Sequence, residues 1–170
     1  MNNSLEIENK DINDFIESLH SGDLVEIYTD GSCMGNPGPG GWGAVLLHNN
    51  KRAILSGYDE KTTNNKMELI AAIEAISIIP RLINIHIYTD SEYVKNGITI
   101  WVHSWVKNSW RTSDNKPVKN QDLWKKLYEL NESKDITWHW VKGHSNCINN
   151  ENADFIARSA ILNRKKNIIK

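Results

Sequence analysis

The sequence predicts a mixed α/β domain with a five-stranded mixed sheet flanked by helices. Apolar runs of strand length alternate along the chain with longer segments of helical periodicity. Two of these runs end almost identically, in Ile27 to Asp30 and Ile87 to Asp90, and a helical segment separates them. This is typical of parallel strands joined by a helical crossover. The composition, with 39% hydrophobic and 24% charged residues, excludes a disordered or collagen-like chain.

The first half of the domain is predicted to begin with a three-stranded meander. A strand over residues 24–30 (LVEIYTD) leads into a glycine-dense turn, 31–43, which holds six of the ten glycines. Strands at 43–48 and 52–58 are separated by a short polar turn and continue the sheet in antiparallel fashion. A helix follows over about 64–79, because its apolar residues crowd one broad face and Pro80 ends it.

The second half returns to the sheet twice. A strand at 83–90 (INIHIYTD) precedes short helices within 91–130, a last strand at 136–141 and a helix from about Asn149 to Leu162. His139 alternates with two tryptophans in the last strand and is expected to be structural. The organisation is then an acidic N-terminal extension (1–22), one domain (23–162) and a basic C-terminal tail (163–170).

The N-terminal extension has its own signature. Residues 1–22 hold five acidic side chains and one basic side chain, so the remaining chain is net positive and suits a polyanionic partner. Three outcomes are open: a helix docked on the domain, a disordered tail, or an acidic segment that competes with substrate. Docking best explains the amphipathic spacing of four apolar residues. They are Ile12, Phe15, Ile16 and Leu19.

Composition and cysteine usage indicate a cytoplasmic protein with no membrane partner. No apolar stretch approaches the ~20 residues of a transmembrane helix, and the N-terminus lacks the basic start of a secretion signal. Cys33 and Cys147 are far apart and form no CxxC motif, which favours reduced thiols over a zinc site or a disulfide scaffold.

The two matched strand ends carry the strongest chemical signal. Because ligands gather at the carboxyl ends of parallel strands, Asp30 and Asp90 are expected to lie side by side. Neighbouring carboxylates repel unless a cation or a proton neutralises them, and oxygen ligands without Cys or His favour Mg²⁺ or Mn²⁺. The structural alternative is that each Asp only caps the turn that follows it.

Three further residues are candidates for the same site. Glu68 stands on a largely apolar helix, where the alternative role is that of a capping-box partner. Asp154 interrupts an apolar stretch of the last helix. His144 follows Gly143 at the end of the last strand, where a histidine on a loop can carry protons.

These elements, in order, resemble the type 1 ribonuclease H family of bacterial type over about residues 23–162. The matching segments are DGSCMGNPGPGGWG, TTNNKMEL, YTDSEYV, VKGH and ENADFIA. The resemblance implies a ribonuclease H-like fold. It also implies endonucleolytic hydrolysis of the RNA strand of RNA/DNA hybrids with two metal ions, leaving 5′-phosphate and 3′-hydroxyl ends, as in RNA primer removal during DNA replication. Asp30, Glu68, Asp90 and Asp154 would bind metal, His144 would transfer protons, and the enzyme would act as a monomer.

The resemblance also implies a substrate-binding surface. Segment 101–126 interleaves tryptophans with basic residues, which suits hybrid binding, although a packed helix surface with solvated lysines explains about half of them. In the family this region is a basic protrusion. The expected contacts are Cys33, Asn36, Thr63, Asn64, Asn65, Trp101, Trp105, Lys107 and Lys119.

Departures from the family pattern leave rival interpretations to weigh. Glu92 stands where bacterial members usually carry Gln, and Val106 and Asn108 replace residues of the protrusion that are often basic. An integrase or resolvase on the same fold would lack the protrusion and the TTNNKMEL motif. A catalytically dead hybrid-binding module would not be expected to keep all four carboxylates and His144.

Overall fold

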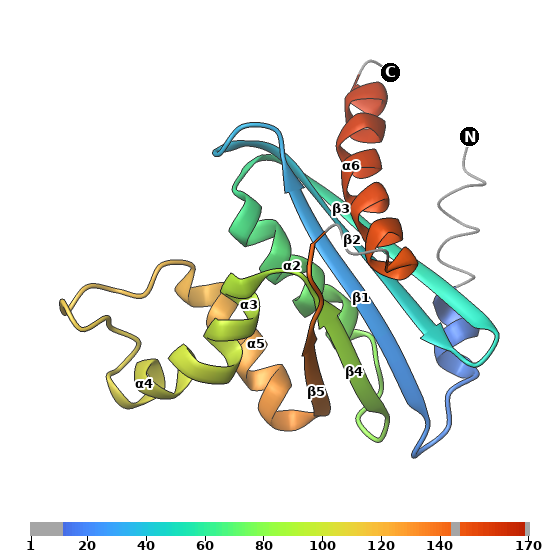
Figure 1. The fold of residues 1–170 in the computed structure, drawn as a ribbon, viewed down its shortest axis with the longest axis horizontal. Coiled ribbons are helices and arrows are strands. Elements are labelled where there is room, and N and C mark those ends of the chain that lie inside the picture. Colours follow the sequence, from blue (N-terminus) through green and yellow to red (C-terminus); the bar gives the residue numbers. More distant parts are fainter. Residues whose placement is uncertain (1–11, 144–146, 169–170) are drawn as a thin grey trace.

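The computed structural model describes residues 12–143 and 147–168 and forms a five-stranded sheet with helices on both faces (Figure 1). The N-terminal meander, its crossover helix and the fourth strand are β1 (Leu24–Cys33), β2 (Gly38–His48), β3 (Lys51–Thr62), α2 (Asn64–Ser77) and β4 (Asn84–Thr89). The remaining elements are α3 (Glu92–Asn96), a π-helical turn η1 (Gly97–Trp101), α4 (Val102–Lys107), α5 (Gln121–Ser133), β5 (Asp135–Trp140) and α6 (Ile148–Ile168).

The strand order in the sheet is β3-β2-β1-β4-β5. β1, β2 and β3 pair antiparallel, whereas β1 with β4 and β4 with β5 pair parallel, which confirms the predicted mixed sheet. The two similar strands lie in matched register, with Tyr28 opposite Tyr88 and Thr29 opposite Thr89. Both strands therefore run toward the same edge of the sheet, where β4 ends at Thr89 and β1 continues to Cys33.

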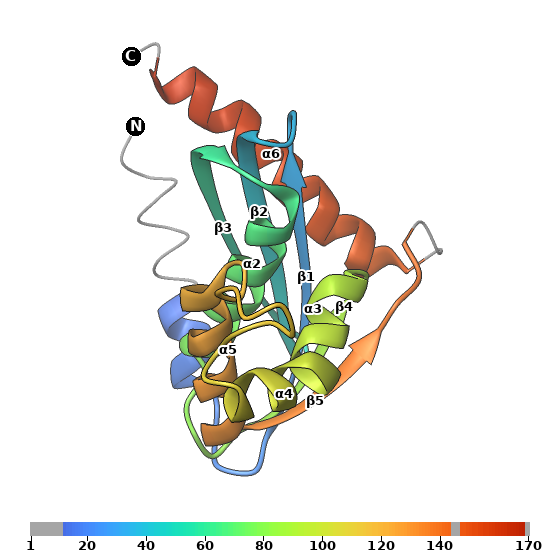
Figure 2. The same cartoon turned by 90° about the vertical axis from the view of Figure 1, so that its left-hand side faces the viewer.

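Each face of the sheet has its own apolar packing. The main core lies between the sheet and α2 and α5, and it includes Ile27, Ile87, Leu69 and the fully buried Trp124. A smaller cluster forms where α6 crosses the opposite face over β1, β2 and β3 (Figures 1 and 2). Side chains that alternate along β1 thus point into two different layers.

The sequence-based boundaries need two main corrections. The glycine-dense segment is not all turn, because β2 already begins at Gly38, and two of its glycines, Gly41 and Gly43, lie under α6. A Cβ at Gly41 would collide with the Ala157 carbonyl oxygen, so the missing side chain is what lets the helix pack this close. The last helix runs to Ile168 and continues beyond the expected end at Leu162.

Residues 12–17 are helical and pack on the domain. The Phe15 side chain is 2% exposed and belongs to the main core, against which Ile12 and Leu19 also pack. For these residues the structure matches the docked outcome, and residues 1–11 lie outside the described part. Across the described residues, every helix is too short or too polar to cross a membrane.

Candidate active site

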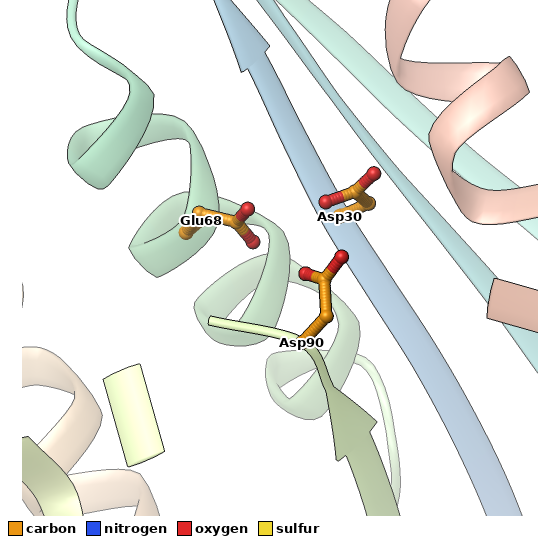
Figure 3. Close-up of side chains that lie close together, drawn as sticks. All are labelled: Asp30, Glu68 and Asp90. Atoms are coloured by element: carbon orange, nitrogen blue, oxygen red, sulfur yellow. The ribbon is translucent and has the colours of Figure 1, made fainter. Parts of the chain in front are cut away.

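Three carboxylates converge where β4 ends beside β1, which continues past the expected end at Asp30 to Cys33. Asp30 lies on β1, Asp90 follows β4 directly, and Glu68 projects from α2 toward both (Figure 3). Ligand oxygens of the three side chains lie within 4.8 Å of one another. Asp30 and Glu68 are each only 5% exposed. The predicted proximity of Asp30 and Asp90 is confirmed, and Glu68 joins them from the crossover helix.

Local backbone features set this geometry. Gly31 brings α2 against β1, because a Cβ at Gly31 would come within 2.6 Å of the Glu68 backbone nitrogen. The Thr63 hydroxyl accepts a hydrogen bond from the Lys66 N–H at 3.3 Å and caps the start of α2. The capping-box role considered for Glu68 is not used, since its side chain is buried within the carboxylate cluster.

The electrostatics of this cluster are unfavourable without a cation. Burial, with the neighbouring Asp90 as the next cause, raises the pKa of Asp30 to about 8. Burial and the charges of Asp30 and Asp90 raise the pKa of Glu68 well above its ordinary range. Both shifts mean that the folded protein resists carrying three negative charges here.

A hard divalent cation fits this environment. The Glu68 Oε2 atom is buried and has no hydrogen-bond partner among the described residues. An unpartnered buried carboxylate oxygen is costly unless a cation or a proton occupies the space beside it. The three converging groups offer only oxygen ligands, which is the donor set that Mg²⁺ and Mn²⁺ prefer.

Asp154 lies on the wall of the same cavity but outside the group of three. It projects from α6, and its Oδ2 atom accepts an ion-paired hydrogen bond from Arg158 Nη2 at 2.8 Å. Its proximity still contributes to the raised pKa of Asp30. Asp154, the fourth predicted carboxylate, therefore lies at the site. Its side chain is paired there with Arg158, one helical turn further along α6.

The cavity has a volume of about 400 Å³ and includes polar residues that the sequence analysis missed. Asn150 is 4% exposed, and its Oδ1 has no partner among the described residues. Because it precedes Asp154 by four positions, helical spacing alone places it on the same face. The lining residues are Asp30, Gly31, Ser32, Asn64, Glu68, Asp90, Ser91, Asn150, Glu151 and Asp154. His144 lies outside the described residues.

The substrate-contact candidates of the first loops lie close to this cavity. The Asn36 Oδ1 accepts a hydrogen bond from the Asn64 N–H at 3.3 Å, and Asn64 itself lines the cavity. Asn65 is exposed beside it. The Cys33 thiol is half-buried and donates to the Gly35 carbonyl at 2.7 Å, while burial raises its pKa.

The aromatic residues of 93–128 form one connected cluster. The Trp105 ring packs against Trp124 at 5.3 Å and Trp101 at 6.0 Å. Trp105 is thus largely a packing residue, whereas Trp101 remains 38% exposed. Lys107 and Lys119 are exposed on the surface around this cluster. The segment therefore has the packed aromatic surface and the solvated lysines of the structural alternative, and the exposed Trp101 and lysines stay available as candidate contacts.

Comparison with known proteins adds an independent line of evidence. The family profile described as RNase H matches residues 22–162. The chain is 57% identical over 136 residues to a protein named ribonuclease H from Pseudoalteromonas atlantica, which covers 80% of this chain and 89% of that one. It is 51% identical over 139 residues to a ribonuclease H from Bradyrhizobium diazoefficiens, with 82% and 90% covered.

Solved structures agree with these sequence matches. LC9-RNase H1, described as a type 1 RNase H with the type 2 active-site motif, superposes with a TM-score of 0.75 at 31% identity. The match covers 85% of this chain and 74% of that one. LC11-RNase H1, solved in complex with an RNA/DNA hybrid, shares the fold with a TM-score of 0.61 at 21% identity, covering 82% and 98%. The chain belongs to the ribonuclease H family.

Proposed function

We propose that this protein is an endonuclease that hydrolyses the RNA strand of RNA/DNA hybrids, leaving 5′-phosphate and 3′-hydroxyl ends. The observation that carries this proposal is the convergence of Asp30, Glu68 and Asp90 within 4.8 Å at the carboxyl edge of the sheet. The family membership supports the same reaction class. Removal of RNA primers during replication is the corresponding role in the cell.

The carboxylates are proposed to hold two divalent ions, Mg²⁺ with Mn²⁺ as an alternative. Such ions activate a water molecule, stabilise the leaving oxygen and neutralise part of the charge on the phosphate. Asp30 and Glu68 would give up their bound protons, and Asp30, Glu68 and Asp90 would present the oxygen ligands. Asp154 would be the fourth ligand if its side chain released Arg158. His144 moves a proton between the reacting oxygens and solvent.

Substrate recognition is proposed to use shape, phosphates and 2′-hydroxyls more than base edges. Asn36, Asn64 and Asn65 stand beside the carboxylates, where the scissile RNA strand must lie. The remaining assignments follow the resemblance and the surface chemistry of the protrusion: Cys33 and Thr63 near the first loops, and Trp101, Trp105, Lys107 and Lys119 along the basic aromatic segment.

The setting is proposed to be a monomer in the cytoplasm. Both cysteines are free thiols, which suits a reducing compartment.

The decisive experiment is cleavage of an end-labelled RNA/DNA hybrid with Mg²⁺ and with EDTA. We expect cleavage of the RNA strand only, with Mg²⁺ only, and no cleavage of a DNA/DNA duplex of the same sequence. Binding of the hybrid without cleavage in Mg²⁺ and Mn²⁺ would identify a hybrid-binding module instead. Similar cleavage of both duplexes would favour the resolvase-like alternative.

A further inference from the structure

A row of stacked rings crosses three strands on the face of the sheet that α6 covers only in part. Tyr28 on β1 and Tyr88 on β4 stack with their centroids 4.5 Å apart and their planes 7° from parallel. His139 on β5 stacks on Tyr88, also at 4.5 Å. This arrangement follows from the register, which places Tyr28 opposite Tyr88 and Tyr88 opposite His139.

The row ends in a pair of imidazoles. His86 lies two residues before Tyr88 on β4, so it is the diagonal neighbour of His139, and the two rings are 5.0 Å apart. The His86 Nδ1 and His139 Nε2 atoms face each other at 2.9 Å. Both side chains are half-buried, and neither lines the carboxylate cavity.

This pair can be converted into a chelate. In the neutral state one nitrogen donates its proton to the lone pair of the other, so transfer of that proton to the second nitrogen of the donating ring frees the lone pairs of both facing nitrogens with no net loss of a proton. A tetrahedral ion with Zn–N bonds of about 2.0 to 2.1 Å holds its two nitrogens roughly 3.4 Å apart. The two nitrogens therefore need to separate by about half an ångström and the rings need to turn so that both lone pairs face one ion, while stacking on Tyr88 keeps the His139 ring beside His86.

The surroundings favour a cation on this face. Glu26 on β1 is the register partner of His86. The charge of Glu26 contributes to the raised pKa values of both Tyr28 and Tyr88, so its carboxylate lies near the ring row. Imidazole ligands suit zinc, copper and nickel, whereas Mg²⁺ prefers the oxygen ligands of the other site.

We propose that His86 and His139 form a binding site for one divalent transition-metal ion, with Zn²⁺ as the representative, separate from the catalytic carboxylates. Water completes the coordination on the open side of the pair. His86 precedes Asp90 by four residues, which is roughly 13 Å along an extended strand. The proposal does not depend on the proposed nuclease function.

The test is calorimetric titration of the full-length protein with Zn²⁺ in the presence of excess Mg²⁺, which occupies the carboxylates. We expect one zinc ion to bind, and His86→Gln and His139→Gln each to weaken that event by about 10-fold or more. His103→Gln is the matched control, because His103 is exposed on α4 away from the pair. That variant should bind zinc like the wild type.

A second measurement covers the case in which a variant is misfolded. In the wild-type protein, Zn²⁺ should shift the ¹⁵N resonances of His86 Nδ1 and His139 Nε2 and leave His103 unchanged. Unmoved resonances at both nitrogens, or wild-type affinity in both glutamine variants, would overturn the proposal. Loss of zinc binding in Asp30→Asn alone would show that the ion uses the carboxylates instead.

Discussion

Gly31 lies directly against the backbone of Glu68. A Cβ at Gly31 would come within 2.6 Å of the Glu68 nitrogen and 2.7 Å of the Met67 carbonyl carbon. Backbone atoms cannot move aside as a flexible side chain can, so the close approach of α2 to β1 depends on this glycine. Gly31 therefore sets the distance between Asp30 and Glu68, and with it the geometry of the cation site.

Gly31→Ala is expected to push α2 away from β1 and to weaken both Mg²⁺ binding and cleavage. A shift of about 1 Å in catalytic geometry can reduce a rate by ~10²-fold. Mg²⁺ titration and hybrid cleavage measure the effect. Gly57→Ala is the matched control. Its Cβ would crowd the Trp42 side chain at a position that lies away from the carboxylates. Both variants should lose stability, and only Gly31→Ala should lose metal affinity.

Asp30→Asn is expected to abolish Mg²⁺-dependent cleavage while hybrid binding survives. The change removes a charged oxygen ligand and adds no repulsion toward the phosphates. Cleavage assays and hybrid affinity measured in parallel separate the two effects, with the exposed Asp114→Asn as a control. Turnover at the wild-type rate would contradict the assignment of Asp30 as a ligand.

The stability of the metal-free protein should depend on pH through the same cluster. Burial raises the pKa of Asp30 to about 8, whereas the unfolded-state value is about 4. The folded state then binds more protons than the unfolded state across this range, so this contribution to the unfolding free energy falls as pH rises from about 4 through about 8. Melting temperatures measured in EDTA should show this loss.

Added Mg²⁺ should reduce that loss, because the ion binds the deprotonated carboxylates and stabilises the folded state. Glu68→Gln should also flatten the dependence, since it removes one of the three charges. A pH profile that is the same in EDTA, in Mg²⁺ and in Glu68→Gln would contradict the proposed coupling.

His144→Ala should reduce cleavage on the order of 10²-fold or somewhat less, because solvent can replace part of the proton transfer. The measurement is the cleavage rate at saturating hybrid across pH, with His103→Ala as a control. A complete loss of activity would instead indicate a structural or ligand role for this residue.

The sequence was sufficient for the antiparallel meander, for the parallel pairing of the strands that carry Asp30 and Asp90, and for part of the site, because those features follow from chain-local signals. Matched strand ends predict that Asp30 and Asp90 are neighbours once a helix joins parallel strands. The same logic missed Asn150, although its spacing from Asp154 was available. It also underestimated the length of β2. Glycines that make room for a packed helix cannot be told from turn residues as long as the position of α6 is unknown.

Contacts between distant segments were the hardest to foresee. His139 was expected to be structural from its alternation with two tryptophans, and nothing near it in the chain points to His86. Only the register of β4 against β5 brings the two rings together. The Arg158 partner of Asp154 has the ordinary i, i+4 spacing, but that spacing does not reveal which of two neighbours a carboxylate prefers.

The N-terminal extension is expected to stabilise the domain without taking part in catalysis. Phe15 is 2% exposed in the main core, so Phe15→Ala should cost about 3 kcal/mol, which is roughly 6 to 12 °C in melting temperature for a domain of this size. Asn13→Ala, on the exposed side of the same helix, is the matched control and should change little.

Deletion of residues 1–22 should likewise lower the melting temperature and leave the turnover number at saturating hybrid nearly unchanged, because no described residue of this segment lines the carboxylate cavity. The net charge of −4 provides the competing explanation. If the deletion leaves the melting temperature unchanged and tightens hybrid binding, the segment acts as an electrostatic competitor. The gain in hybrid affinity should then become smaller as the salt concentration is raised, because screening weakens the electrostatic attraction between the acidic segment and the basic surface.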